Sequence, residues 1–234
     1  MRKLTLIAAT LIVATGASMP AADTTSKGAP PVEPPTGAII LFDGKDVSAW
    51  MQHKSMRIPT KEEMKSPPAC HYKIVDGALE VNDPGHLITK QRFGDFRLHV
   101  EVWLPGEQGV NSGIWTHYRY CTEIRGRNEK GAKYRLGAIY GLKAPDVDAS
   151  KPARTWQTLD ITFRNARFDS SGAKIENARI TVLLNVVKIH DDVQIERRCP
   201  TLQEPEGSAP GPIVLENHQG QGRVRFRNIW IVPM

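Results

Sequence analysis

A strict alternation of apolar and polar residues constrains the fold of this chain more than any other feature. Between residues 95 and 104 every second side chain is apolar, and these are Phe96, Leu98, Val100, Val102 and Leu104. In an extended strand, side chains two residues apart point to the same face. The pattern therefore predicts a strand with one buried face, and it recurs at 159–163, 180–184 and 224–230.

Turn signals divide the rest of the chain into short segments. Asp43-Gly44 and Asp76-Gly77 adjoin short apolar runs, and no long segment has a clear helical period. Many short strands joined by frequent turns are typical of sandwiches and jelly rolls. We therefore expect an all-β fold, either a β-sandwich or a jelly roll.

One expected turn is unusual. Residues 182–184 and 187–189 look like the arms of a hairpin around Asn185-Val186. A tight two-residue hairpin prefers Asn-Gly, because both central residues need a positive φ, and valine is poor in that conformation. Either the loop is longer than two residues or some strain is tolerated.

Residues 1–22 are predicted to be a secretory signal peptide. Two basic residues open the chain, and 4–14 is an apolar run too short to span a bilayer comfortably. Cleavage is expected between Ala17 and Ala22, which would leave the mature protein periplasmic or secreted. A retained membrane anchor is the alternative. After cleavage no stable membrane insertion is expected, because no other apolar stretch approaches the roughly 20 residues of a transmembrane helix.

Residues 23–36 are predicted to be a linker, because they are rich in proline, threonine and small residues. The remaining residues, 37–234, suit a single all-β domain. The formal net charge of +6 is mild, and the basic residues alternate with apolar ones instead of forming a concentrated basic face. Nucleic acid is therefore not expected as a partner.

The chain contains three cysteines, Cys70, Cys121 and Cys199. Export permits a disulfide, and an odd number leaves one thiol outside any bridge. Cys70 and Cys199 both lie in loop-like sequence beside proline, so this pair is favoured. Cys121 falls within an expected strand and is expected to be a buried, unreactive thiol.

A series of short motifs follows in order along the domain. They are Leu41 to Trp50, Asp76-Gly77-Ala78-Leu79, Asp95-Phe96, Asn111-Ser112-Gly113, Gly137 to Gly141, Ala144 to Val147, Trp156-Gln157-Thr158, Leu215 to His218, and Val224 to Ile229. Together they resemble the 3-keto-disaccharide hydrolase domain family, from about Ala38 to Val232. The resemblance implies a concanavalin A-like jelly-roll β-sandwich of two antiparallel sheets, with a sugar site on the concave face.

The resemblance also implies a chemistry. The substrates would be sugars whose C3 hydroxyl has been oxidised to a ketone, which acidifies the proton on C2. A base removes that proton, the substituent on C1 leaves, and water adds back. This route needs a general base, an acid for the departing oxygen, and positive charge or hydrogen-bond donors near the C3 oxygen.

The chain departs from the family at two positions that are commonly acidic. Members commonly carry a glutamate in place of Cys121 and an aspartate in place of Gly126, while Glu123 stands where glutamine is frequent. Cys121, Glu123 and Arg125 share one face of a strand. Either the carboxylate has moved two residues along the same wall, or catalysis has been lost and a sugar-binding shell remains.

Glu123 and His218 are the candidate catalytic residues, because a carboxylate and an imidazole can both transfer protons near neutral pH. The alternatives are that Glu123 is a solvated carboxylate paired with Arg119 or Arg125, and that His218 is a structural loop residue.

Five further residues are candidates for substrate binding, namely Asn111, Trp115, Tyr140, Glu216 and Arg227. Aromatic rings can stack on the face of a sugar, and amides and charged groups can bind its hydroxyls. Glu216 could be a second carboxylate or could orient His218. The structural alternatives are a turn residue at Asn111, a core residue at Trp115 and an outward strand cation at Arg227.

A divalent metal is a candidate cofactor. His99 and His117, with Glu101 or Glu123, would ligate it and help to stabilise an enolate, although the histidines show no metal-binding spacing. No other cofactor is indicated, and a carbohydrate is the expected partner.

The expected function is that of an exported, carbohydrate-active hydrolase or lyase that cleaves 3-keto-glycosides by proton abstraction next to the ketone. The alternative is a non-catalytic glycan-binding module of the same family. A structural envelope domain is a third interpretation.

Overall fold

The computed structural model describes residues 31–54, 57–81, 85–126, 131–202, 204–218 and 223–234. The predicted signal peptide and the first part of the predicted linker lie outside these ranges. The described chain consists mainly of strands and loops, with one short helix, α1 (Lys61–Lys65), and one 3₁₀ turn at Ala132–Tyr134. Within the described ranges, no helix is both long and apolar enough to cross a bilayer.

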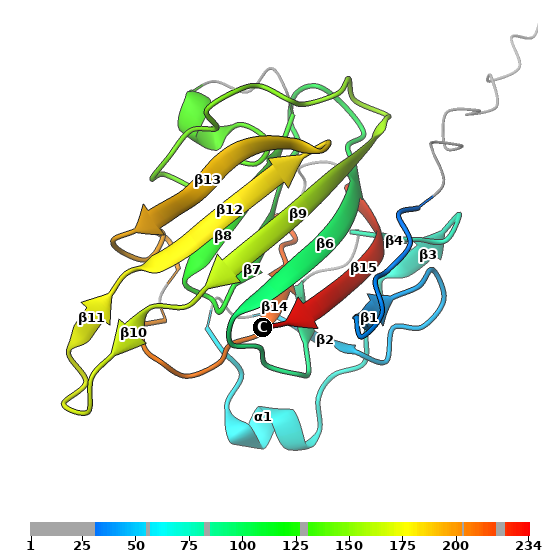
Figure 1. Cartoon of the computed structure of the whole chain (residues 1–234). Helices are drawn as coiled ribbons and strands as arrows, with labels where there is room; N and C mark the ends of the chain where they lie inside the picture. Colours follow the sequence, from blue (N-terminus) through cyan, green and yellow to red (C-terminus); the bar gives the residue numbers. More distant parts are fainter. Residues whose placement is uncertain (1–30, 55–56, 82–84, 127–130, 203, 219–222) are drawn as a thin grey trace, which may run out of the picture.

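The strands form a jelly-roll sandwich of two antiparallel sheets, as expected from the alternation (Figure 1). The larger sheet contains β1 (Ile39–Phe42), β3 (Lys73–Val75), β4 (Ala78–Glu80), β6 (Phe96–Trp103), β9 (Trp156–Arg164), β12 (Ala178–Leu184), β13 (Val187–Ile195) and β15 (Arg225–Pro233). Its strand order is β13-β12-β9-β6-β15-β4-β3, and β1 also pairs with β15.

The smaller sheet forms the second layer, with strand order β2-β5-β14-β7-β8. Its strands are β2 (Trp50–His53), β5 (His86–Thr89), β7 (Asn111–Thr116), β8 (Tyr120–Arg125) and β14 (Ile213–Leu215). A separate two-stranded ribbon, β10 (Arg167–Phe168) with β11 (Lys174–Glu176), projects at one end of the molecule (Figure 1).

The hydrophobic core contains residues of both sheets. On β6, Phe96, Leu98 and Val100 are at most 1 % exposed, and they belong to the same core cluster as Ile114 of β7 and Ile124 of β8. Burying an aliphatic or aromatic side chain of this size contributes roughly 1.5–3 kcal/mol. The apolar residues that the alternation places on the buried face of β6 therefore pack between the two sheets and hold them together.

The outer face of β6 is more enclosed than the sequence pattern indicates. His99 is 1 % exposed and Glu101 is 2 % exposed. His99 stacks on Trp230 with ring centres 4.8 Å apart, and Arg227 Nε donates to Glu101 Oε2 at 2.7 Å. Neighbouring aromatic and charged side chains therefore cover positions that alternation alone assigns to solvent.

The described end of the linker lies against this outer face. The Val32 amide donates to Glu101 Oε1 at 3.1 Å, and the side-chain amide of Asn228 donates to the Val32 carbonyl at 2.7 Å. Both backbone polar groups of Val32 are thus paired, which fixes this part of the linker to β6 and β15.

The hairpin between β12 and β13 has a two-residue turn, with Leu184 paired to Val187. Asn185 has a φ of 52° and Val186 a φ of 64°, so the strained alternative is the one observed. Asn185 helps to hold the turn, because its side-chain amide donates to the Ala149 carbonyl at 2.9 Å.

The expected Cys70–Cys199 disulfide is wrong, because none of the three cysteines forms a disulfide. Cys199 instead accepts a hydrogen bond at its Sγ from the Cys121 amide, at 3.1 Å. Burial raises the pKa of the Cys199 thiol to about 12, and burial also raises that of Cys121. Cys121 is buried as predicted, and its thiol remains protonated, which makes it a poor nucleophile.

Candidate active site

One pocket lies on the face of the smaller sheet that is turned away from the core. It is a cavity of about 120 Å³. It is lined by Asn111, Trp115, Cys121, Glu123, Arg125, Tyr140, Thr201, Glu216 and His218. Six of the seven site residues predicted from the sequence are therefore brought together, from β7, β8, the segment after β14 and the loop after the 3₁₀ turn.

Strand register brings the two acidic side chains to the same wall. Gly113 of β7 is paired with Glu123 of β8, and on its other side the Glu216 amide donates to the Gly113 carbonyl at 2.8 Å. Directly paired residues of neighbouring antiparallel strands point to the same face. Because Gly113 has no side chain, Cys121 Sγ and Glu216 Oε2 can lie over it, 2.7 Å and 2.8 Å from the place a β-carbon would take.

The loop at 137–140 runs along the free edge of β8 and forms one side of the pocket. The Gly137 amide donates to the Glu123 carbonyl at 2.8 Å, and the Tyr140 amide donates to the Cys121 carbonyl at 3.0 Å. These bonds satisfy backbone groups that an edge strand would otherwise leave open. They also bring Tyr140 into the wall of the pocket.

Glu123 is a buried carboxylate, 2 % exposed, in direct contact with the guanidinium of Arg125. Burial raises the pKa of Glu123 to about 7, and the negative charge of Glu216 acts in the same direction, while Arg125 opposes both. Desolvation disfavours the charged form of an acid, which explains the sign. At neutral pH Glu123 can therefore both accept and release a proton.

Glu216 is a second carboxyl group with a perturbed pKa. Burial raises the pKa of Glu216 to about 7, opposed by a hydrogen bond from Trp115 and by the charge of Arg125. The Trp115 indole N–H donates to Glu216 Oε2 at 3.3 Å. Trp115 is thus both a buried residue and a pocket residue, so the core and binding interpretations of it are compatible.

His218 follows β14 and is the exposed member of the predicted proton-transfer pair. The segment before it is anchored by His86 of β5, whose Nδ1 accepts a hydrogen bond from the Asn217 amide at 3.1 Å. Burial lowers the pKa of His86 to about 4, and the ring packs on Trp115 with centres 4.6 Å apart. His86 is therefore neutral and positions the Glu216–His218 segment.

Sequence reasoning assigned no site role to Arg125, Thr201 or His86. For Arg125 a signal existed, because it shares a strand face with Glu123. Thr201 comes from a loop about 75 residues further along the chain, and His86 acts through a hydrogen bond to the backbone of another strand. Neither leaves a local pattern in the sequence.

The two departures from the family have a structural basis. A β-carbon at Gly126 would lie 2.3 Å from the Glu107 carbonyl oxygen, so no side chain fits there without moving the backbone. Cys121 is 4 % exposed, and its Sγ lies 3.9 Å from Glu123 Oε1. The acidic group that β8 contributes to the pocket is therefore Glu123, and the position of Gly126 is closed to an aspartate.

Arg227 does not lie with this pocket. It is on β15 of the larger sheet, where it pairs with Glu101 and stacks on Trp156 with its guanidinium carbon 4.0 Å from the ring centre. The alternative of an outward strand arginine is thus the one observed, and Arg125 is the guanidinium that lines the pocket.

The predicted metal ligands are not assembled. His99 pairs with Asp160 at 2.8 Å on the outer face of the larger sheet, whereas His117 is packed in the core against Phe163, with ring centres 5.1 Å apart. Among the described residues, no group of three or more His, Cys, Asp or Glu side chains is arranged to hold a metal ion. These residues do not fit the metal site that the sequence suggested.

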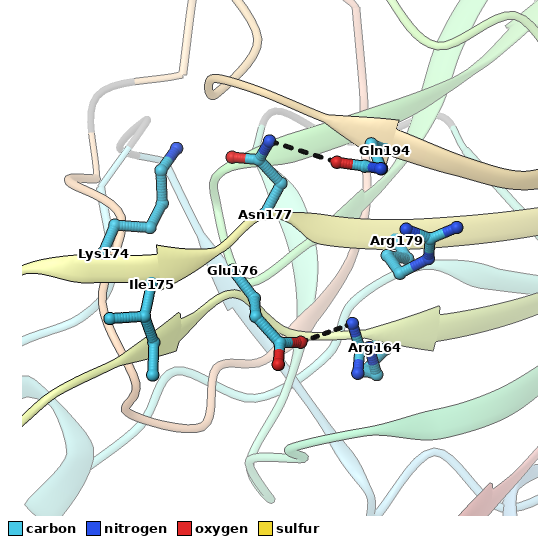
Figure 2. Close-up of a pocket in the computed structure, with 7 residues that line it drawn as sticks. All are labelled: Arg164, Lys174, Ile175, Glu176, Asn177, Arg179 and Gln194. Carbon is cyan, nitrogen blue, oxygen red and sulfur yellow. Dashed lines mark hydrogen bonds and ion pairs between the residues drawn. The ribbon is translucent and has the colours of Figure 1, made fainter.

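A larger hollow, about 520 Å³, lies beside the β10–β11 ribbon (Figure 2). Its cations are already paired: Arg164 with Glu176 at 2.6 Å, and Lys174 with Glu206 at 2.9 Å. Figure 2 shows the Arg164–Glu176 pair among the residues that line this hollow. This groove is larger than the pocket on the smaller sheet, but its carboxylate is an exposed ion-pair partner, so it is the weaker candidate for catalysis.

Comparison with solved structures places the chain among proteins of the same fold. A provisionally assigned glycosyl hydrolase from Parabacteroides distasonis is 28 % identical, with a TM-score of 0.74 over 90 % of this chain and 95 % of that one. A second such protein from the same organism is 14 % identical, with a TM-score of 0.62 over 85 % and 94 % of the two chains, and supports the fold alone. No curated protein sequence matches this chain.

The model of the family described as the 3-keto-alpha-glucoside-1,2-lyase-like domain matches residues 37–232. This is the family that the ordered motifs resemble, and the match extends over nearly the whole predicted domain. The chain therefore belongs to the 3-keto-alpha-glucoside-1,2-lyase-like domain family, a family of carbohydrate-active, glycosyl hydrolase-like domains.

Proposed function

We propose that this protein is an exported enzyme that cleaves 3-keto-glycosides by removing the proton on C2 next to the C3 ketone. The observation that carries the proposal is the pocket of the smaller sheet, where Glu123 and His218 lie together with Asn111, Trp115 and Tyr140. Family membership supports the substrate class, and the glycosyl hydrolase name of the 28 % identical relative supports action on a glycan.

Each group has a role in this chemistry. Glu123, with a pKa raised to about 7 by burial, takes the C2 proton. His218 gives a proton to the oxygen that departs from C1. The positive charge of Arg125 stabilises the enolate at the C3 oxygen, while Trp115 and Tyr140 hold the sugar ring and Asn111 binds a hydroxyl. Water then adds to C1 and C2 regains a proton.

The test is incubation of the purified protein with a 3-keto disaccharide or a chromogenic 3-keto-glucoside. Release of the C1 substituent is expected, and Glu123→Gln should lower the rate by about 10²–10⁴-fold, the usual contribution of a general base. Glu176→Gln, which removes a carboxylate at the distant groove, is the matched control and should retain the wild-type rate. Failure of folded protein to release product, with and without a divalent metal, would contradict the proposal.

A non-catalytic glycan-binding module is the second candidate. It is favoured by the direct contact of Arg125 with Glu123, which can neutralise the carboxylate, and by the two departures at Cys121 and Gly126. Calorimetric binding of an oligosaccharide without turnover would support it. If neither binding nor turnover is measured, a structural envelope domain becomes the better interpretation.

A further inference from the structure

We propose that the same pocket also hydrolyses ordinary glycosides, which carry no ketone at C3, with Glu216 as the general acid and Glu123 as the general base. This inference shares the pocket of the proposed function but does not depend on the keto-sugar chemistry. It extends the activity to a second substrate class and gives Glu216 a catalytic role.

The two carboxyl groups face each other across one strand. Glu123 is on β8 and Glu216 follows β14, and β7 lies between them with Gly113 at the level of both. Gly113 has no side chain, so Glu216 Oε2 can extend over it, to 2.8 Å from the place a β-carbon would take. The sheet thus presents two acids to the same pocket, one on each side of β7.

Contacts around Gly113 limit the distance between these acids. The β-carbon position of Gly113 lies 2.7 Å from Cys121 Sγ and 2.8 Å from Glu216 Oε2, and Cys121 Sγ lies 3.9 Å from Glu123 Oε1. Taken together, these three distances mean that Glu216 Oε2 and Glu123 Oε1 lie less than about 9.5 Å apart. Glycoside hydrolases that use two carboxyl groups hold them roughly 5–9.5 Å apart.

The surroundings of the pair separate the two roles. Glu123 is buried and Glu216 is half-buried, and the negative charge of Glu216 adds to burial in raising the pKa of Glu123. Arg125 contacts Glu123 directly and favours the anion there. Glu216 Oε2 instead accepts a hydrogen bond from the neutral Trp115 N–H, which favours an anion less than a guanidinium does, so the proton is assigned to Glu216.

The reaction requires no further reagent besides water. Glu123 takes a proton from a water molecule as the water oxygen forms a bond to C1. The bond between C1 and the glycosidic oxygen breaks, and its electron pair stays on that oxygen, which receives the proton of Glu216. Glu216 is left as the anion and Glu123 as the acid, and exchange with solvent restores the starting state.

The experiment compares matched substrates, p-nitrophenyl glucoside and its 3-keto derivative, in both anomeric forms. Release of nitrophenol from the unoxidised glucoside supports the inference. Release from the keto sugar alone overturns it while leaving the proposed function intact. If neither substrate reacts, both proposals fail, and if only the unoxidised glucoside reacts, the proposed function fails and the inference stands.

The role of Glu216 is tested by measuring how the rate loss in Glu216→Gln depends on the leaving group of the substrate. Glu216→Gln should slow hydrolysis of a phenyl glucoside by about 100-fold or more, the usual loss for a general acid. It should slow the p-nitrophenyl glucoside much less, because nitrophenolate departs without a proton. Equal losses on both substrates would mark a structural role for Glu216 and overturn the assignment. Glu216→Asp, which keeps the acid but shortens it, provides a second variant, and Glu176→Gln is the control.

Discussion

At the residue scale, two glycines decide the shape of the site. Gly126 packs against the Glu107 carbonyl, which closes the place where an aspartate is common in the family. Gly113 leaves room for Cys121 Sγ and Glu216 Oε2, which lie 2.7 Å and 2.8 Å from the place its β-carbon would take. Glycine is required at such points because even one β-carbon would clash with the neighbouring atoms. At Gly113 those atoms belong to the pocket wall.

Gly113→Ala should therefore lower activity while the protein still folds. The new methyl group would meet side-chain ends at Glu216, Cys121 and Trp115, which can rotate away and carry the Glu216 carboxyl group with them. A displacement of about 1 Å can cost about 100-fold in rate. Gly94→Ala, where a β-carbon meets nothing within 4 Å, is the control for the measured kcat/KM. An unchanged rate in Gly113→Ala would show that the position of the Glu216 carboxyl group does not matter for the reaction.

Glu123 should make the stability of the protein depend on pH. Its pKa rises from 4.5 to about 7 on folding, so the folded state binds the proton more tightly than the unfolded state. The stability linked to this group is fully present below about pH 4.5 and is lost as the pH rises to about 7. At about 1.4 kcal/mol per pKa unit, the loss amounts to up to about 3 kcal/mol.

Urea unfolding at pH 5 and pH 8 measures this effect. Glu123→Gln, which keeps the shape without the titrating group, should lose less stability between the two pH values than the wild type. The remaining decrease in the variant would belong to Glu216, whose pKa is also raised to about 7. Equal losses in both proteins would argue that Glu123 is not desolvated as the structure indicates.

At the element scale, the smaller sheet assembles the pocket and the larger sheet supports it. β7 and β8 pair in register, and β14 joins them from a part of the chain about 90 residues further on. The larger sheet carries its own buried charges on its outer face, among them the Glu101–Arg227 pair. Two residues of the same type can thus have different roles. Arg125 of the smaller sheet lines the pocket, whereas Arg227 of the larger sheet pairs with Glu101.

The strained hairpin of the larger sheet yields a prediction about stability. Val186 is 81 % exposed and has a φ of 64°, so its side chain gains little from packing while its backbone is strained. The left-handed conformation costs a residue with a β-carbon roughly 1–2 kcal/mol. Glycine avoids this cost, but its greater entropy in the unfolded state offsets part of the gain. Val186→Gly should stabilise the protein by about 0.5–1 kcal/mol.

The change is measured as the free energy of unfolding in urea. Val186→Ala is the informative comparison, since it removes the branched side chain but keeps the β-carbon, and it should gain less than the glycine variant. A decrease in stability for Val186→Gly would mean that the turn is not strained in solution.

At the scale of the whole molecule, a two-layer sandwich presents a pocket on the face of its smaller sheet that is turned away from the core. The jelly-roll order places five segments of the chain around about 120 Å³ of space. Val32, near the described start of the chain, is held to the larger sheet instead. The described end of the predicted linker therefore contacts the layer opposite to the pocket.

Export is the prediction that belongs to this scale. When the full chain is expressed in a bacterial host, its mature form should begin between Ala17 and Ala22, as read by intact mass. The apolar run at 4–14 directs this step, so a chain that starts at residue 23 should stay in the cytoplasm. Recovery of the uncleaved full chain in the membrane fraction would favour the retained anchor.

Local sequence patterns determined the fold class and most of the candidate site. The two-residue period of β6, β9 and β12 is a property of neighbouring side chains. The ordered motifs carry the family and four of the six predicted residues that line the pocket, namely Asn111, Tyr140, Glu216 and His218. Only the tertiary structure decided how distant segments of the chain lie relative to one another. These relations include the separation of Arg227 from the pocket, the lack of a Cys70–Cys199 bridge, the distance between His99 and His117, and the meeting of Glu123 with Glu216. The physical reason is that periodicity reports which face a side chain takes on its own strand, whereas register and strand order decide which other side chains it meets.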